Sequence, residues 1–247
     1  MDDQQLLVRR ELAGLNYYAF LKRYFAARRP RNYLEIGVSH GKSFMLAECP
    51  AIGVDPAPEL RGDIVGVKPH ASVFRMGSDD FFATGMLEHL FPERVDLAFL
   101  DGMHLFEYLL RDFINTERRA RPEGTIIMHD CLPINAEMAE RERRPALRKD
   151  VAYKSHWTGD VWKVLFILKE YRPDLDVTVL DSQPTGLTIV EGLDPASDVL
   201  TRNYERIVAD YRDQTLTDEN LLALGDRLGI RSSDAWLADV EARHGQS

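Results

Sequence analysis

Short apolar segments alternate with amphipathic segments along most of the chain. The apolar segments have the length of strands and cover residues 51–55, 72–76, 95–100 and 125–129. Between the later ones, residues 83–90 and 106–113 carry apolar side chains at the spacing of a one-sided helix. Strands that alternate with helices form right-handed crossovers and a parallel sheet covered on both faces. The pattern therefore predicts a Rossmann-like, doubly wound α/β sheet.

The pattern changes at both ends of this alternating region. Before it, apolar residues from Leu12 to Ala19 recur near helical spacing, which predicts a helix to about Arg29, ended by Pro30 and followed by a strand over 31–37. After it, a helix over 160–171 leads to two apolar segments, 177–180 and 187–190. The stretch between these two is too short for a crossover helix, so we expect them to pair as antiparallel strands.

We expect one domain from the length of 247 residues. It comprises an N-terminal helical arm (1–30), an α/β core (31–192) and C-terminal helices (193–247). The net charge of −9 argues against nucleic acid as a partner. No stretch approaches the roughly 18 apolar residues of a membrane span, and Cys49 and Cys131 fit neither a disulfide framework nor a zinc motif. A cytoplasmic protein without a membrane partner is expected, and whether the arm forms a homo-oligomer contact is left open.

The strongest local signal is the loop from Glu35 to Ser43, which the pattern places between the first strand and the start of a helix. Gly37 and Gly41 permit a tight turn and a close approach of a ligand to the backbone. Free N–H groups at a helix start favour an anionic group. Asp55 ends the second strand about twenty residues further on, where a carboxylate can accept hydrogen bonds from both ribose hydroxyls. The loop therefore indicates a nucleoside-containing ligand.

Several ligands compete for this loop, beside a plain turn that binds nothing. A phosphate-binding loop needs one more residue between Gly37 and Gly41, and a dinucleotide fingerprint needs glycine where Ser39 stands. S-adenosyl-L-methionine (SAM) has no phosphate, so a looser loop suffices for it.

Five segments occur in order over about residues 30–190: YLEIGVSHGKS, GVDP, MGSDDFF, FLDGMHLFEY and GTIIMHDCLP. As a set they resemble the successive motifs of class I SAM-dependent methyltransferases. The resemblance is greatest to sugar O-methyltransferases of the macrocin and rhamnosyl type, which are related to catechol-type enzymes. It implies SAM as the cofactor and an antiparallel seventh strand.

The resemblance also implies which residues hold SAM. They are Glu35, Gly37, Ser39, Gly41 and Ser43 around the methionine part, Asp55 at the ribose, Ser78 and Asp79 at the adenine, and Asp101. As an alternative, Ser78 and Asp79 precede an apolar helix and would serve equally well as helix N-caps.

Two further segments leave the carboxyl ends of neighbouring strands, where open α/β sheets place their active sites. Methyl transfer to a hydroxyl requires removal of its proton, which suits a histidine, and a divalent cation can hold the resulting oxyanion. By resemblance to the catechol-type enzymes, Asp101 and Asp130 match cation ligands. His104 takes the position of their general base, which is a lysine there, and His129 is expected to assist.

The sequence departs from those relatives at Cys131, where they carry Asn or Asp. A thiol is a poor partner for Mg²⁺, which prefers oxygen. His129 could complete the ligand set with Asp101 and Asp130, which would favour Mn²⁺, Fe²⁺ or Zn²⁺, or the site holds no metal. The sequence leaves both alternatives open.

The acceptor is expected to be a small hydroxylated molecule such as a sugar, glycoside or nucleotide-sugar. Residues 156–160 are candidates for the acceptor pocket, although Asp160 would also serve as a plain N-cap of the late helix. The basic stretch 141–149 could close over an anionic acceptor, although such runs are more often solvated surface. Rival functions are an NAD(P)-dependent oxidoreductase and a SAM-binding protein without catalysis.

Overall fold

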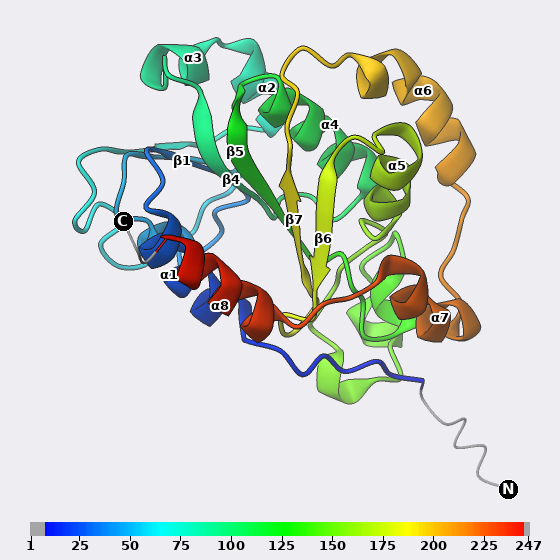
Figure 1. The fold of residues 1–247 in the computed structure, drawn as a ribbon. Helices are drawn as coiled ribbons and strands as arrows, with labels where there is room; N and C mark the ends of the chain where they lie inside the picture. Colours follow the sequence, from blue (N-terminus) through cyan, green and yellow to red (C-terminus); the bar gives the residue numbers. More distant parts are fainter. Residues whose placement is uncertain (1–7, 245–247) are drawn as a thin grey trace, which may run out of the picture.

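The computed structural model describes residues 8–244, in which seven strands form one sheet in the order β3-β2-β1-β4-β5-β7-β6 (Figure 1). The strands are β1 (Tyr33–Ile36), β2 (Ala51–Val54), β3 (Ala71–Phe74), β4 (Val95–Leu100), β5 (Ala120–His129), β6 (Asp176–Leu180) and β7 (Leu187–Glu191). The helices are α1 (Tyr17–Arg28), α2 (Ser78–Ala83), α3 (Met86–Leu90), α4 (Phe106–Glu117), α5 (Lys163–Tyr171), α6 (Val199–Tyr211), α7 (Asp218–Leu228) and α8 (Ser233–His244).

The pairing of the strands confirms the predicted fold class. β1 pairs in parallel with β2 and β4, and β4 pairs in parallel with β5. β7 is antiparallel to both β5 and β6, as expected for two apolar segments joined by a short connection. All four residues of β1 are buried, because a central strand of such a sheet has helices over both of its faces.

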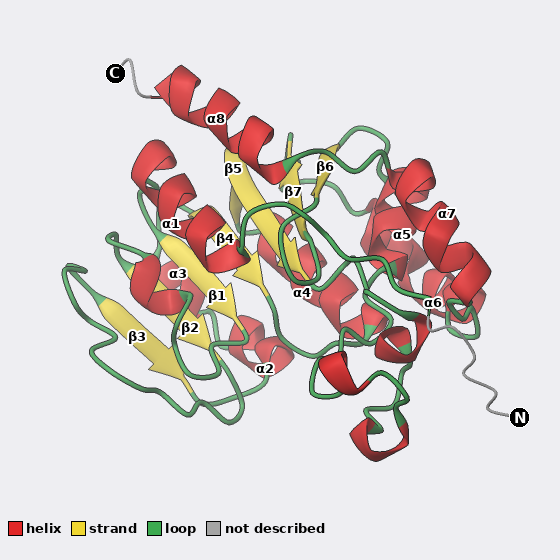
Figure 2. Ribbon diagram, turned by 90° about the horizontal axis from the view of Figure 1, so that it is seen from below, coloured by secondary structure: helices red, strands yellow, loops and turns green. Residues whose placement is uncertain are grey.

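Helices cover the two faces of the sheet in separate groups (Figure 2). α1 and α8, from opposite ends of the chain, lie side by side on one face, and α2, α4, α5 and α6 lie on the other (Figure 1). In the first group, Phe20 and Tyr24 of α1 each stack on Trp236 of α8, with ring centroids 6.0 Å apart. The apolar side chains of each group form their own buried cluster against the sheet.

The N-terminal segment differs from its prediction. α1 begins only at Tyr17, so residues 8–15 are not helical. Tertiary hydrogen bonds replace the helical ones, since Arg10 N–H donates to the carbonyl of Ile134 and Gly14 N–H to that of Asp181. The helical prediction was wrong here because these partners are remote in sequence. The part of that prediction on residues 1–7 lies outside the described residues.

Three helix predictions also need correction. The glycine loop after β1 leads to one short turn of 3₁₀ helix (Phe44–Leu46) rather than to an α-helix, so the argument from a helix N-terminus does not apply. The segment 83–90 is divided between α2 and α3 at Gly85, whose φ of +71° is left-handed. α5 begins at Lys163 with Trp162 as its N-cap, so Asp160 does not cap it.

None of the helices in the described residues is long and apolar enough to cross a membrane.

Candidate active site

A cavity of about 600 Å³ lies at the carboxyl edge of the parallel strands. Its wall is formed by the loops after β1, β2, β3 and β4 and by part of α4. Of the residues implied to hold SAM, those in the wall are Gly37, Ser39, Asp55, Ser78, Asp79 and Asp101. A volume in this range accommodates a ligand of nucleoside size.

Gly37 brings the loops after β1 and β4 together. Its φ is +91°, and a Cβ atom added there would lie 2.0 Å from the carbonyl oxygen of Asp101. The main chain after β4 therefore packs directly on Gly37, where only glycine leaves room. Asp101 N–H in turn donates to the carbonyl of Ile36, at 2.8 Å.

Asp55 holds the loop after β1 as well as facing the cavity. One of its carboxylate oxygens accepts the N–H of Ser39 at 2.8 Å, and the other accepts the N–H of Ala57 at 2.7 Å. These two bonds fix the carboxylate at the end of β2. Each oxygen keeps a lone pair for a further donor, such as a ribose hydroxyl.

Three of the residues implied to hold SAM do not line the cavity: Glu35, Gly41 and Ser43. The carboxyl group of Glu35 is fully buried and accepts hydrogen bonds from the hydroxyls of Ser43, at 2.6 Å, and Tyr33, at 2.7 Å. Burial raises the pKa of Glu35 to about 8, against the opposing effect of both hydroxyls. The structure thus places Glu35 and Ser43 under the loop, where they support its conformation.

Ser78 and Asp79 occupy the first turn of α2, whose N-cap is Gly77. Neither is therefore the N-cap of that helix. Asp79 is half-exposed and accepts a hydrogen bond from Nε of Arg111 at 2.9 Å. The side chain of Ser78 interacts with the buried Asp112, a residue that the sequence did not single out.

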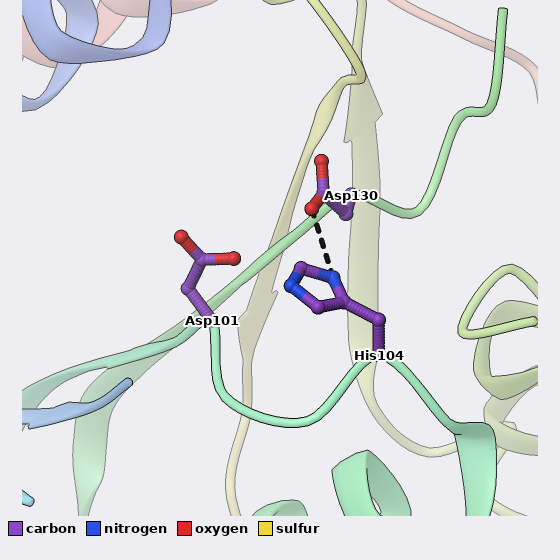
Figure 3. Close-up of side chains that lie close together, drawn as sticks. All are labelled: Asp101, His104 and Asp130. Atoms are coloured by element: carbon purple, nitrogen blue, oxygen red, sulfur yellow. Dashed lines mark ion pairs between the residues drawn. The ribbon is translucent and has the colours of Figure 1, made fainter. Parts of the chain in front are cut away.

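The side chains after β4 and β5 meet at the edge of the cavity. Nδ1 of His104 lies 3.0 Å from Oδ2 of Asp130, with Asp101 beside them (Figure 3). The hydroxyl of Thr185 donates to the other oxygen of Asp130. Burial lowers the pKa of His104, but the hydrogen bond and charge of Asp130, with Asp101, raise it above its ordinary value overall.

His129 lies beneath this pair. Its Nδ1 is 3.2 Å from Oδ1 of Asp101 and 3.3 Å from Oδ1 of Asp130. Nε2 is buried without a hydrogen-bond partner among the described residues, and the ring of Tyr17 packs on His129 with centroids 4.2 Å apart. Burial lowers the pKa of His129, but the two carboxylates outweigh it and raise the pKa to about 9. His129 thus carries the positive charge that compensates two adjacent carboxylates, and it does not line the cavity.

Asp101, His104 and Asp130 also form a group whose ligand atoms all lie within 4.8 Å of one another. Two carboxylates and an imidazole are a donor set that suits a divalent transition metal. The set differs from the expected one, because His104 takes the place proposed for His129. Cys131 is buried and its thiol donates to the carbonyl of His129, so it adds no ligand.

The segment before α5 packs on the loop that carries His104. Trp157 lines the cavity with its ring 5.4 Å from that of His104. Asp160 accepts the N–H of Phe106 at 2.9 Å and therefore caps α4 from a distance. In the basic stretch, Arg141 pairs with Glu107 and Asp160, so its guanidinium is engaged within the chain.

Sequence analysis missed Tyr17, Asp112 and Thr185 as site residues. Each reaches the site from an element whose place depends on packing: the start of α1, the middle of α4 and the turn before β7. No local pattern in the sequence distinguishes them from ordinary core or turn residues.

Comparisons with known proteins agree with this geometry. Residues 34–131 match a family model described as a methyltransferase domain, and no curated protein matches the chain. Among solved structures, cofactor-bound Rv0187 from MTB is 19% identical with a TM-score of 0.51, over 71% of this chain and 78% of that one. The methyltransferase PaMTH1 of Podospora anserina, bound to S-adenosylhomocysteine (SAH), is 16% identical with a TM-score of 0.51, over 72% and 78%.

The two structures show the fold, and the family model identifies the part of the sequence that contains the glycine loop, Asp55, Asp101 and Asp130. The match to a methyltransferase-domain model is at odds with the rival interpretation of the protein as an NAD(P)-dependent oxidoreductase. Residues 34–131 therefore match a methyltransferase domain, and the strand order around them agrees with the resemblance to class I SAM-dependent methyltransferases.

Proposed function

We propose that the chain transfers the methyl group of SAM to a hydroxyl group of a small acceptor, with His104 as the general base. The observation that carries the proposal is the 3.0 Å contact between Nδ1 of His104 and Oδ2 of Asp130, with the imidazole in the cavity wall. A histidine held through one ring nitrogen by a carboxylate presents the other nitrogen as a base.

The geometry supports a single displacement. Asp130 accepts Nδ1–H of His104, which leaves Nε2 free to take the proton of the acceptor hydroxyl. The oxygen forms a bond to the methyl carbon as the bond from that carbon to the sulfonium sulfur breaks. The products are the methyl ether, the neutral thioether SAH and a proton on His104, which is then released to water.

Two contacts support Asp130 in the role of holding His104. Thr185 donates to one of its oxygens, and the charge of His129 lies on the same side. These neighbours, with His104 itself, hold the pKa of Asp130 below its usual range although burial opposes them. Asp130 therefore stays ionised and keeps the proton of His104 on Nδ1, which matters for a base that works through Nε2.

Metal-assisted transfer is a second candidate, favoured by the grouping of Asp101, His104 and Asp130. A divalent cation bound there would lower the pKa of the acceptor hydroxyl. If Nδ1 of His104 served as a ligand, its proton would stand on Nε2 and His104 could not be the base. The two mechanisms therefore exclude each other at His104.

We propose a sugar or glycoside as the acceptor. Trp157 supports this, because its half-buried ring stands next to His104 in the cavity wall and offers an apolar face of the kind that a sugar ring can cover. Its indole N–H donates to the carbonyl of Glu140 at 2.7 Å, which fixes the orientation of the ring.

The test measures methyl transfer from labelled SAM to a panel of sugars, glycosides and phenols, with SAH affinity determined in parallel. We expect His104→Ala to reduce turnover by roughly 10²-fold or more while the SAH dissociation constant changes little. His89→Ala, an exposed histidine on α3, is the matched control.

Three outcomes would separate the alternatives. Unchanged turnover in His104→Ala would remove His104 from the mechanism. Loss of wild-type activity in EDTA, restored by Mn²⁺ or Mg²⁺, would favour the metal-assisted mechanism. SAH binding without transfer to any acceptor would indicate a SAM-binding protein without catalysis.

A further inference from the structure

Asp112 is a buried acid in the wall of the cofactor cavity. It lies on α4, is only 3% exposed, and stands between the first turn of α2 and the loop after β4. A Cβ atom added at Gly102 would lie 3.5 Å from its Oδ2, and the side chain of Ser78 interacts with its carboxyl group. Oδ1 has no hydrogen-bond partner among the described residues. A buried carboxyl oxygen without a donor is unfavourable, so this position calls for one.

Asp79, the neighbouring acid, is in a different situation. Its side chain is 47% exposed and its carboxylate accepts a hydrogen bond from Nε of Arg111. Among the described residues, 8–244, Asp112 has no partner in an ion pair. Of the acids in the cavity wall near Ser78, Asp79 and Asp80 are exposed and Asp79 is paired with Arg111, whereas Asp112 is buried.

We propose that Asp112 recognises the adenine base of SAM, through the exocyclic amino group and the ring nitrogen next to it. The proposal rests on SAM as the cofactor and assigns the base-specific contact to α4 rather than to Asp79. It makes Asp112 a specificity-determining residue that takes no part in methyl transfer.

The chemistry of a buried carboxylic acid matches that edge of adenine. The amino group is a donor and the adjacent ring nitrogen is an acceptor, and a neutral carboxyl group offers a carbonyl acceptor and an O–H donor in one plane. Burial raises the pKa of Asp112 to about 7, helped by the charge of Asp79 and opposed by Ser78 and Arg111. A side-chain amide pairs with adenine in the same two-bond manner, so asparagine is a conservative replacement.

The first experiment compares two ligands by calorimetry: SAH, and the purine analogue in which hydrogen replaces the amino group. We expect wild-type protein to prefer SAH by about tenfold or more. Asp112→Leu should bring this preference close to one, because both ligands then lack the contact. An unchanged preference in Asp112→Leu would overturn the proposal, as would loss of the preference in Asp79→Asn instead.

A second experiment keeps the proposal testable if the leucine variant does not fold. The SAH affinity of the wild type should fall as pH rises above about 7, by up to tenfold per pH unit, because the protonated acid is the binding form. Asp112→Asn should bind SAH without that pH dependence. Asp210→Asn, an exposed acid on α6, is the control and should titrate like the wild type.

The outcomes also distinguish this proposal from the cofactor assignment. If SAH binding to Asp112→Asn showed the same pH dependence as the wild type, the contact between Asp112 and adenine would be contradicted. The assignment of SAM as the cofactor would still stand. Wild-type protein that binds neither SAH nor its analogue would contradict SAM as the cofactor.

Discussion

Glu35 and His129 hold protonation states opposite to those of the same side chains in water. Glu35 has a pKa of about 8, because burial outweighs the hydroxyls that donate to it. His129 has a pKa of about 9, because two carboxylates outweigh its burial. Near neutral pH the carboxyl group under the glycine loop is therefore neutral and the imidazole beneath the active site is charged. Both side chains support the site without lining the cavity.

Glu35 makes the stability of the protein depend on pH. Its folded pKa of about 8 lies above the ordinary value of 4.5, so between these values the folded state binds one proton more than the unfolded state. The free energy of unfolding should therefore fall as pH rises through this window, by at most about 1.4 kcal/mol per pH unit.

Glu35→Gln should remove this contribution, because a glutamine does not titrate. Urea unfolding of both proteins at pH 5.5, 6.5 and 7.5 measures the two slopes. Equal slopes would show that Glu35 is ionised in the folded state.

At the scale of elements, the segment between Trp157 and Asp160 connects α4, α5 and the His104 loop. Gly159 has a φ of +56°, and a Cβ atom added there would lie 1.7 Å from the carbonyl oxygen of His104. Asp160 caps α4 and pairs with the buried Lys163 at 2.8 Å. The position of His104 therefore depends on a segment more than fifty residues further along the chain.

Gly159→Ala should disturb this contact and lower turnover together with stability. The alanine would have to adopt a left-handed φ, and its methyl group would displace the main chain at His104. Gly85→Ala is the matched control, since Gly85 has a φ of +71° and open space around it. The control should cost only about 1–2 kcal/mol for the left-handed backbone and leave turnover unchanged.

Thermal unfolding and methyl transfer measured on both alanine variants test this expectation. If Gly159→Ala and Gly85→Ala lost the same stability and neither lost activity, the contact with His104 would be unimportant.

At the scale of the whole molecule, the two ends of the described chain close one face of the sheet. α8 lies along α1 (Figure 1), and Trp236 packs against Phe20 and Tyr24, whose rings also stack on each other. Arg23 and Glu241 add a pair at 2.8 Å, which is partly exposed and contributes little. Burial of aromatic surface is thus the main interaction between the two helices. Tyr17, the first residue of α1, packs its ring on the imidazole of His129, so the packing of α1 and α8 extends to the active site.

Trp236→Ala should lower the free energy of unfolding by about 3–5 kcal/mol, because it leaves a large cavity between α1 and α8. Leu222→Ala is the control, since Leu222 is 58% exposed on α7 and should change stability by no more than about 0.5 kcal/mol. Urea unfolding at constant pH gives both values. A similar small loss in both variants would mean that α8 contributes little to the fold.

The sequence alone determined the sheet and the edge at which the site lies. Apolar periodicity located the strands, and the short connection before β7 required an antiparallel pair, because both are local properties of the chain. Asp101 and Asp130 could be placed together because neighbouring parallel strands end at one edge.

Tertiary structure alone decided which side chains face the cavity. Asp130 has a left-handed φ of +61°, so its side chain does not follow the alternation of an extended strand. Its carboxylate lies 3.3 Å from Nδ1 of His129, and His104 meets it from another loop. Asp112, Thr185 and Tyr17 reach the site through the packing of α4, β7 and α1, and residues 8–15 exchange helical hydrogen bonds for remote partners. Such contacts join segments far apart in sequence, and their free energy depends on the burial and fit of whole elements, which no local pattern of residues specifies.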